Sequence, residues 1–443
     1  MKRYNIAKDT FIIPFEDYFI LYAPLKNKIL KINGGVVSML KNINNAELPD
    51  SDNEVFKMLV NNEFIILNTK EKIDGISETP INEDNFRPTS VTLFPTSDCN
   101  MACVYCFASA GETSHKLDLS IAKEAINFIA KNAIDKKQDY IRVGFHGGGE
   151  PLFNFKFTRD ILKYSKEKCQ SLNLKLKTST ATNGILNPTQ LNWINENIDN
   201  VSLSFDGPAH IQDIIRPLKN GKGSTNYVLK SVKFFEENNI SYSIRSTITN
   251  YSIENLIEII DFFSQISTNK TFHFEPVIET GRCSSSGTQG LSPKIFLEKL
   301  ISAKEYAKNK RLNIYYSSGR IGEVMNKFCG AVGQNFFITP LGEITSCIEV
   351  SKVSDSKSDI FFYGKYNKET GFKFDFEKLN YLGNRTVNNI PSCQSCFAKY
   401  NCAGDCLVKL KKDIYDTSTN DRCELNRGIL AYELQEIINN QIF

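Results

Sequence analysis

The chain has 443 residues, 41% of them hydrophobic and 23% charged, which is enough apolar material for two or three domains with sizeable cores. Its 53 basic and 50 acidic residues nearly cancel, so no overall field favours nucleic acid or a membrane surface. No apolar run approaches the roughly 18 residues of a membrane span, and residues 1–11 lack the apolar core of a signal peptide. We therefore expect a globular, cytoplasmic protein with no nucleic-acid or membrane partner.

Residues 1–85 are expected to form a small domain of their own. Apolar stretches separated by turn residues predict three strands, at residues 10–14, 18–22 and 28–32. Helical spacing of apolar residues predicts helices over 36–42 and 55–64, the second capped by Asp50 or Ser51. The polar, turn-rich segment 71–87 is the expected linker.

Residues 86–310 alternate between strand-like and helix-like segments. Strands are expected at residues 90–95, 140–145, 175–180, 201–205, 241–248 and 271–277, with helices at 120–131, 156–170, 227–238 and 253–265. Such alternation predicts an α/β fold with a parallel sheet, in which site residues gather at the carboxyl ends of the strands.

The segment Cys99-Asn-Met-Ala-Cys103-Val-Tyr-Cys106 follows the first of these strands. Three thiolates at this spacing can hold one 4Fe-4S cluster and leave its fourth iron without a protein ligand. A structural zinc site, which would need a fourth ligand close by, and three unconnected core cysteines are the alternatives.

Neither alternative accounts for Gly144-Phe-His-Gly-Gly-Gly-Glu-Pro151, which follows the next predicted strand. Consecutive glycines let a ligand approach the backbone closely, and Glu150 can accept hydrogen bonds from an ammonium group.

Together the two motifs resemble those of the radical S-adenosylmethionine (SAM) enzymes. The resemblance implies an open, TIM-like (β/α)6 barrel in which Cys99, Cys103 and Cys106 hold a 4Fe-4S cluster. SAM would chelate the open iron through its methionine amine and carboxylate and be cleaved reductively to a 5′-deoxyadenosyl radical. The resemblance also implies SAM contacts from a set of strand-end residues: Tyr105, Gly147, Gly148, Gly149, Glu150, Asn183, Ser204 and Arg245. For Asn183, Ser204 and Arg245, a turn or a cap of the sheet is the alternative.

Residues 311–443 carry seven further cysteines, in an order that resembles the SPASM extension of radical SAM enzymes. That resemblance implies two auxiliary 4Fe-4S clusters. The outer cluster would take Cys393, Cys396, Cys402 and Cys423, and the inner one Cys329, Cys347 and Cys406. The inner cluster is one cysteine short, so its fourth site is open, taken by substrate, or filled from elsewhere, with Cys283 as the spare thiol. A helix from Arg427 onward is expected to close the chain.

The predicted N-terminal domain resembles the winged-helix-like, PqqD-type peptide recognition element, in which a leader peptide adds as a strand to the sheet edge. A small stabilising cap without a ligand is the alternative. With this domain, the chain resembles maturases of ribosomally made precursor peptides, and most of all the streptide type that joins a lysine carbon to a tryptophan ring.

This resemblance implies a carbon–carbon cross-link within a precursor peptide that carries a leader, with electrons from a flavodoxin or ferredoxin. Thioether-forming (sactionine-type) maturases and anaerobic sulfatase-maturating enzymes, which make formylglycine, are the enzymatic alternatives. An iron–sulfur electron carrier is the non-enzymatic one, and it would not need residues 147–150. A proton acceptor is needed if oxidation follows bond formation. The candidates lie at predicted strand ends or beside Cys347, with surface carboxylates as the alternative: Asp206, Glu275, Glu279 and Glu349.

Overall fold

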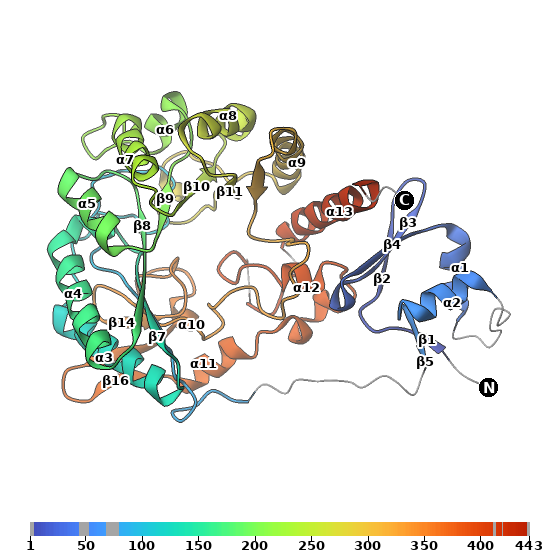
Figure 1. Cartoon of the computed structure of the whole chain (residues 1–443), viewed down its shortest axis with the longest axis horizontal. Coiled ribbons are helices and arrows are strands. Elements are labelled where there is room, and N and C mark those ends of the chain that lie inside the picture. The colour runs from blue at the N-terminus through green and yellow to red at the C-terminus, as the bar shows by residue number, and fades with distance from the viewer. Residues whose placement is uncertain (1–3, 44–52, 68–78, 411–412, 419, 441–443) are drawn as a thin grey trace.

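The computed structural model describes residues 4–43, 53–67, 79–410, 413–418 and 420–440. A barrel-like sheet flanked by helices occupies one end of the molecule, and a small N-terminal domain the other (Figure 1). Helices α12 and α13 of the C-terminal region lie between them in this view. No helix of the described residues is long and apolar enough to cross a membrane.

The N-terminal domain contains two small antiparallel sheets and two helices. One sheet has the order β2-β3-β4, and the other pairs β1 with β5. The bounds are β1 Tyr4–Ile6, β2 Phe11–Pro14, β3 Phe19–Ala23, β4 Lys28–Ile32, α1 Gly34–Asn42, α2 Glu54–Asn61 and β5 Ile65–Leu67. The three predicted strands are present, whereas β1 and β5, each of three residues, are additional.

The start and end of α2 differ from the prediction. Asn53 is its N-cap, since the Asn53 side chain accepts a hydrogen bond from the Phe56 N–H. The predicted caps, Asp50 and Ser51, lie outside the described residues. The helix ends at Asn61 and does not reach residue 64, because Glu63 adopts a left-handed backbone with φ of 59°.

A parallel sheet forms the centre of the molecule, as the alternating pattern predicts, so the α/β fold class is confirmed. Its parallel strands lie side by side in chain order: β6 Ser90–Leu93, β7 Tyr140–Phe145, β8 Lys175–Thr182, β9 Asn200–Ser204, β10 Tyr242–Ile248, β11 Thr271–Pro276 and β12 Asn313–Tyr315. Register aligns Leu93 with Phe145 and Phe145 with Thr180, so the carboxyl ends of neighbouring strands meet at one edge.

Helices follow most of these strands and pack on the outside of the sheet (Figure 1). They are α3 Leu119–Asp135, α4 Phe155–Ser171, α5 Pro188–Asn197, α6 Ala209–Ile215, α7 Thr225–Glu237, α8 Leu256–Ile266 and α9 Pro293–Asn309. Fully buried side chains of strands and helices, such as Ile126, Leu203 and Phe263, make one continuous core.

The C-terminal region continues the same sheet. β13 pairs with β6 in parallel, and β14, β15 and β16 follow as antiparallel neighbours. The bounds are β13 Phe337–Ile338, β14 Glu343–Thr345, β15 Phe362–Asn367, β16 Gly371–Phe374, α10 Ser358–Phe361, α11 Phe376–Gly383, α12 Lys399–Cys402 and α13 Arg422–Asn440. The closing helix begins at Arg422, five residues before the predicted start, because the buried Leu425 extends its apolar face toward the N-terminus. As a result Cys423 lies on a helix.

Candidate active site

The loop after β6 brings three cysteines to the carboxyl edge of the sheet. Backbone N–H groups donate to two of the sulfurs, from Met101 to Cys99 at 3.4 Å and from Ala110 to Cys106 at 3.4 Å. Burial raises the pKa of Cys99 to about 12 and that of Cys103 to about 11. These thiols resist ionisation unless a metal takes the place of the proton.

The loop is fixed from outside by Arg282. Its guanidinium donates to the carbonyl oxygens of Cys103 at 2.9 Å and Ala110 at 2.8 Å, and its backbone N–H donates to Cys106 O at 3.0 Å. The three cysteines are therefore held by a segment 170 or more residues further along the chain.

Glycines 147–149 pass so close to this loop that side chains would not fit. A Cβ on Gly147 would lie 2.5 Å from the Phe94 ring, and one on Gly149 would lie 2.1 Å from the Asp98 carbonyl oxygen. Gly147 and Gly148 also have positive φ values of 75° and 57°. The glycine run thus permits direct backbone packing between the ends of β6 and β7.

Glu150 follows the glycines and is buried. Its carboxylate accepts hydrogen bonds from the Thr182 hydroxyl at 2.9 Å and the Asn183 backbone N–H at 2.8 Å. Burial raises the pKa of Glu150 to about 7, despite these hydrogen bonds. Asn183 in turn donates to Asn100 Oδ1 at 2.7 Å and to the Cys99 sulfur at 3.6 Å. Glu150 and Asn183 therefore join the ends of β7 and β8 to the cysteine loop.

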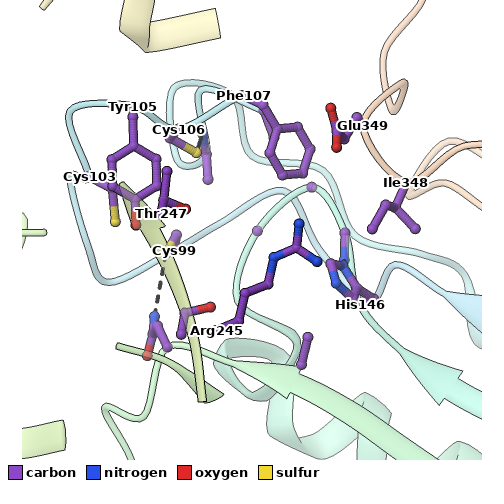
Figure 2. Close-up of a pocket in the computed structure, with 18 of the residues that line it drawn as sticks. Cys99, Cys103, Tyr105, Cys106, Phe107, His146, Arg245, Thr247, Ile348 and Glu349 are labelled. Carbon is purple, nitrogen blue, oxygen red and sulfur yellow. Dashed lines mark hydrogen bonds between the residues drawn. The ribbon is translucent and has the colours of Figure 1, made fainter. Parts of the chain in front are cut away.

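All eight residues expected to contact SAM line one cavity together with Cys99, Cys103 and Cys106. The cavity lies between the cysteine loop, the glycine segment and the ends of β8–β11. Arg245 and His146 lie on one side of it (Figure 2). The sequence-predicted residues therefore share a single site.

A buried charge cluster supports Tyr105. The Tyr105 hydroxyl donates to Asp206 Oδ2 at 2.5 Å and accepts from the Arg216 guanidinium at 2.5 Å. The Thr247 N–H donates to the other oxygen of Asp206 at 2.9 Å. Asp206 is fully buried and does not line the cavity. Asp206, one of the predicted proton acceptors, therefore positions Tyr105.

Glu275 lines the cavity at the end of β11 and forms an ion pair with a lysine of the C-terminal region. Lys409 Nζ lies 3.3 Å from Glu275 Oε2, and His273 Nε2 lies 2.9 Å from Oε1. Burial alone would raise the pKa of Glu275, but Lys409 and the His273 hydrogen bond outweigh it and hold that pKa well below its usual range. Glu275 is therefore an ionised, paired carboxylate.

The remaining two predicted acids differ in position. Glu279 accepts a hydrogen bond from the Gly290 N–H at 2.6 Å and does not line the cavity. Glu349 does line it, next to Ile348, and comes from the C-terminal region opposite the glycine segment (Figure 2). The cavity is thus closed partly by the C-terminal region.

Four of the seven C-terminal cysteines share one cavity. Cys393, Cys396, Cys402 and Cys423 line one small cavity. There the Cys402 sulfur accepts from Asn426 Nδ2 at 3.3 Å and from the Ser318 hydroxyl at 3.4 Å, and both donors are buried. We call these four the outer set.

Cys329, Cys347 and Cys406 form the inner set. Burial raises the pKa of all three, to about 12 for Cys406, and the inner thiols also raise one another's: Cys329 acts on both others, and Cys406 on Cys347. This mutual effect indicates that the three thiols lie near one another; Cys347 is buried, whereas Cys329 is exposed.

The set of Cys99, Cys103 and Cys106, which lines the cavity, fits the three-thiolate side of a 4Fe-4S cluster. In the described part of the chain, no three His, Cys, Asp or Glu side chains converge on a point where one ion could sit. In a 4Fe-4S cluster each thiolate binds a different iron, so its ligands are spread around a larger group. The N–H donors to the Cys99 and Cys106 sulfurs suit such a cluster.

Residues 93–264 match the family model of the radical SAM superfamily. This part of the chain is therefore similar to radical SAM domains. An uncharacterized protein of Methanocaldococcus jannaschii is 32% identical over 167 residues, which are 38% of this chain and 55% of that protein. The chain thus spans about half the length of this relative.

Longer matches include sulfatase-maturating enzymes and a solved structure bound to a precursor peptide. A cysteine-type anaerobic sulfatase-maturating enzyme of Clostridium perfringens is 22% identical over 383 residues, covering 80% of this chain and 98% of its own. The solved structure of anSMEcpe with bound AdoMet and Kp18Cys peptide has a TM-score of 0.61 at 19% identity, over 79% of this chain and 98% of that one. Streptococcus suis SuiB bound to precursor peptide SuiA has a TM-score of 0.53 at 16% identity, over 94% of this chain and 99% of that one. These structures show a common fold.

Several residues of the site were not predicted from the sequence, namely Arg216, Lys409, Arg282 and His146. Burial and the nearby Arg245 lower the pKa of His146 to about 4, so it is neutral at pH 7. For Lys409, a signal was available: a lysine three residues after Cys406, in Cys-Leu-Val-Lys, within a cysteine-rich segment.

Proposed function

We propose that this protein is a radical SAM maturase that installs an intramolecular cross-link in a ribosomally made precursor peptide. The supporting observation is the likeness to SuiB bound to its precursor peptide, which extends over 94% of the chain. The likeness to anSMEcpe extends over 79%. The likeness to the peptide-bound SuiB structure therefore extends over more of this chain, at a TM-score of 0.53 against 0.61.

In this proposal, Cys99, Cys103 and Cys106 hold the cluster, and the cavity beside them holds SAM. The chemistry that the cluster and SAM supply when bound is one-electron reductive cleavage of SAM, which yields a radical able to abstract hydrogen from carbon. The chain's own residues position SAM: the glycine backbone at 147–149 faces the cavity, and Tyr105 is held rigid by Asp206 and Arg216. Arg245, an exposed cation of the cavity wall, suits the SAM carboxylate.

The outer and inner cysteine sets are proposed to hold two auxiliary 4Fe-4S clusters. Forming a carbon–carbon bond between two side chains removes two hydrogen atoms, of which the radical takes one. The second leaves as a proton and an electron, and an auxiliary cluster is a suitable electron acceptor. A flavodoxin or ferredoxin is the proposed electron donor to the first cluster, and the leader of the precursor is proposed to bind residues 1–85.

A lysine–tryptophan carbon–carbon bond is our leading product, and a thioether is the second candidate. The sulfatase-maturating reaction, oxidation of a cysteine to formylglycine, is favoured instead by the 22% identity to the Clostridium perfringens enzyme over 383 residues. Against it, that similarity covers 80% of this chain, and the two small sheets and two helices of the N-terminal domain form a distinct unit.

The test is co-expression of the protein with each short open reading frame next to its gene, followed by mass spectrometry of the peptide. We expect a peptide lighter by two hydrogen atoms whose fragments do not separate across the cross-linked segment. Alkylation of cysteines before analysis distinguishes a carbon–carbon bond, which leaves thiols free, from a thioether.

A variant with Cys99, Cys103 and Cys106 all changed to Ala serves as the control. It should lose about a third of the bound iron and all production of 5′-deoxyadenosine. Continued 5′-deoxyadenosine production by this variant would overturn the proposed site, and formylglycine in a sulfatase peptide would favour the other reaction.

A further inference from the structure

Arg385 is a fully buried arginine of the C-terminal region and follows the end of α11 by two residues. Its guanidinium donates from Nη2 to the Gly404 carbonyl oxygen at 2.6 Å and from Nε to the Ile414 carbonyl oxygen. The third nitrogen, Nη1, is buried and has no hydrogen-bond partner among the residues that the structure describes. Buried polar atoms of native proteins are nearly always hydrogen-bonded, so Nη1 points to an acceptor that the polypeptide itself does not supply.

The guanidinium contacts a segment that joins the two C-terminal cysteine sets. Gly404 lies two residues after Cys402 of the outer set and two residues before Cys406 of the inner set. Gly404 also lines the cavity of the outer set, and a Cβ built on it would lie 3.2 Å from both Nη1 and Nη2. The free nitrogen of Arg385 is therefore directly behind the backbone that connects the outer set to the inner set.

The apolar packing around Arg385 gives the same placement. Ile414, whose carbonyl oxygen accepts from Nε, belongs to one buried cluster with Cys347 of the inner set. Ile390, with which a Cβ on Gly404 would collide, belongs to another buried cluster with Cys393 of the outer set. Arg385 thus lies between the outer and the inner set.

No carboxylate of the described residues forms an ion pair with Arg385. Asp405, the buried acid next to Gly404, uses both oxygens for Arg422, with 2.8 Å from Nε to Oδ2 and 3.3 Å from Nη2 to Oδ1. A buried cation without a counter-charge is strongly destabilising. An anion between the two cysteine sets would supply both the counter-charge and the acceptor for Nη1.

We propose that Arg385 is a positioning residue of the auxiliary clusters, which donates Nη1–H to a cluster sulfur and favours the reduced state by its charge. This inference rests on the auxiliary clusters of the proposed function. A cluster held by thiolates is an anion, so it fits both the free donor and the unpaired charge.

The charge of Arg385 bears on the electron transfer of the proposed reaction. There the substrate radical loses one electron and releases a proton to water, and the auxiliary cluster gains that electron and becomes more negative. Net charge and hydrogen bonds to sulfur set the reduction potential of a cluster. A buried guanidinium therefore makes the auxiliary cluster a better electron acceptor.

The experiment uses the full-length chain with Cys99, Cys103 and Cys106 changed to Ala, so that only the auxiliary clusters contribute a signal. The protein is made with arginine that carries ¹⁵N in its guanidinium group, reconstituted with iron and sulfide, and reduced. Pulsed electron paramagnetic resonance then detects ¹⁵N that is hydrogen-bonded to a paramagnetic cluster. We expect a ¹⁵N coupling in this protein and its loss in Arg385→Lys and Arg385→Gln.

A redox titration followed by the same resonance measures the midpoint potentials. Arg385→Gln should weaken electron acceptance at least about tenfold, which is about 59 mV for one electron. Arg385→Lys keeps the charge and should stay closer to the parent protein, whereas loss of the two carbonyl hydrogen bonds alone would affect both variants alike. Arg142→Gln is the matched control, because it removes an exposed arginine of β7 and should change neither the coupling nor the potentials.

The iron content separates failure of this inference from failure of the proposed function. With about four or eight irons bound per chain, an absent ¹⁵N coupling would overturn the role of Arg385 and leave the proposed function intact. Unchanged potentials in Arg385→Gln would overturn it as well. If Arg385→Gln does not hold its clusters, the coupling in the parent protein and the potentials of Arg385→Lys decide. A chain without bound iron would overturn the auxiliary clusters, and the role of Arg385 with them.

Discussion

Gly149 illustrates how single residues determine the site. Any Cβ at this position would lie 2.1 Å from the Asp98 carbonyl oxygen, which is backbone and cannot rotate away. Gly149→Ala should therefore displace the loop that carries Cys99, at a cost of ~1–3 kcal/mol, and weaken SAM binding at least about tenfold. Calorimetric titration with SAM measures this loss. Gly34→Ala is the control, because no atom lies within 4 Å of a Cβ there. Equal SAM affinity in both variants would contradict the steric argument.

The buried cluster around Tyr105 gives a second prediction. Asp206 and Arg216 have side chains 0% and 8% exposed, and their charged atoms lie 4.0 Å apart with the Tyr105 hydroxyl bonded to both. Asp206→Asn leaves the Arg216 charge without its buried counter-charge, so we expect a loss of ~3–5 kcal/mol of unfolding free energy.

Denaturant unfolding of this variant, beside the surface variant Asp160→Asn, is the measurement. Asp160 pairs with Lys156, whose side chain is 81% exposed, and this change should cost ~0.5 kcal/mol or less. Similar losses in the two variants would show that the Tyr105 cluster does not stabilise the barrel.

Sequence reasoning found the residues whose signal is local. The cysteines and the glycine run are recognisable because their spacing alone makes the chemistry possible. Arg216 was missed because its partner, Tyr105, is 111 residues away in the chain. Asp206 was predicted as a proton acceptor from its strand-end position, but sequence could not reveal that Tyr105 and Thr247 occupy its oxygens.

The same distinction holds for elements. Strands β6–β11 and the long helices between them were predicted, because apolar periodicity persists over many residues. Helix α5 is not predicted, because its apolar periodicity is weak. Its start nevertheless carries a capping box, formed by Asn187 and Gln190. The two-residue strand β13 depends on pairing with β6, 245 residues earlier in the chain, and no local pattern predicts such pairing.

The contact between β11 and the C-terminal region leads to a pH prediction. The pKa of Glu275 is held well below its usual range by Lys409 and His273, against the effect of burial. A carboxyl group whose pKa is lower in the folded than in the unfolded chain stabilises the fold above its unfolded pKa of about 4.3. This contribution is lost as the pH falls through the folded pKa. The wild type should therefore lose stability on acidification below about pH 4.

Glu275→Gln should be less stable at neutral pH by ~3–5 kcal/mol, because Lys409 stays buried without its partner. Its stability should also fall less steeply with acid. Urea unfolding of the cluster-free chain from about pH 3 to 7 measures both effects. Glu254→Gln, which removes an exposed partner of Lys299, is the control with an unchanged acid slope. A parallel pH dependence of wild type and Glu275→Gln would refute the assignment.

On the scale of the whole molecule, the N-terminal domain is attached to the segment that carries the outer cysteines. Lys399, between Cys396 and Cys402, lies 2.9 Å from Asp9, with side chains 1% and 6% exposed. Tyr400 donates to Asp9 at 2.6 Å, and Tyr22 donates to Asn401 at 2.8 Å. Ile20 and Tyr22 of β3 share a buried cluster with Leu430 and Leu434 of α13. The domain is therefore held in a fixed position by the C-terminal region.

This attachment leads to the final prediction. If residues 1–85 bind the leader, their fixed position sets how the rest of the precursor reaches the cavity. Asp9→Asn removes the counter-charge of the buried Lys399 and should weaken domain docking by ~3–5 kcal/mol. We expect a larger radius of gyration in small-angle scattering, unchanged leader affinity, and less modified peptide per molecule of 5′-deoxyadenosine.

Asp17→Asn, an exposed change in the same domain, should behave as wild type. If Asp9→Asn expands the molecule while peptide modification stays fully coupled to SAM cleavage, docking does not guide the precursor, and the domain serves only to capture it.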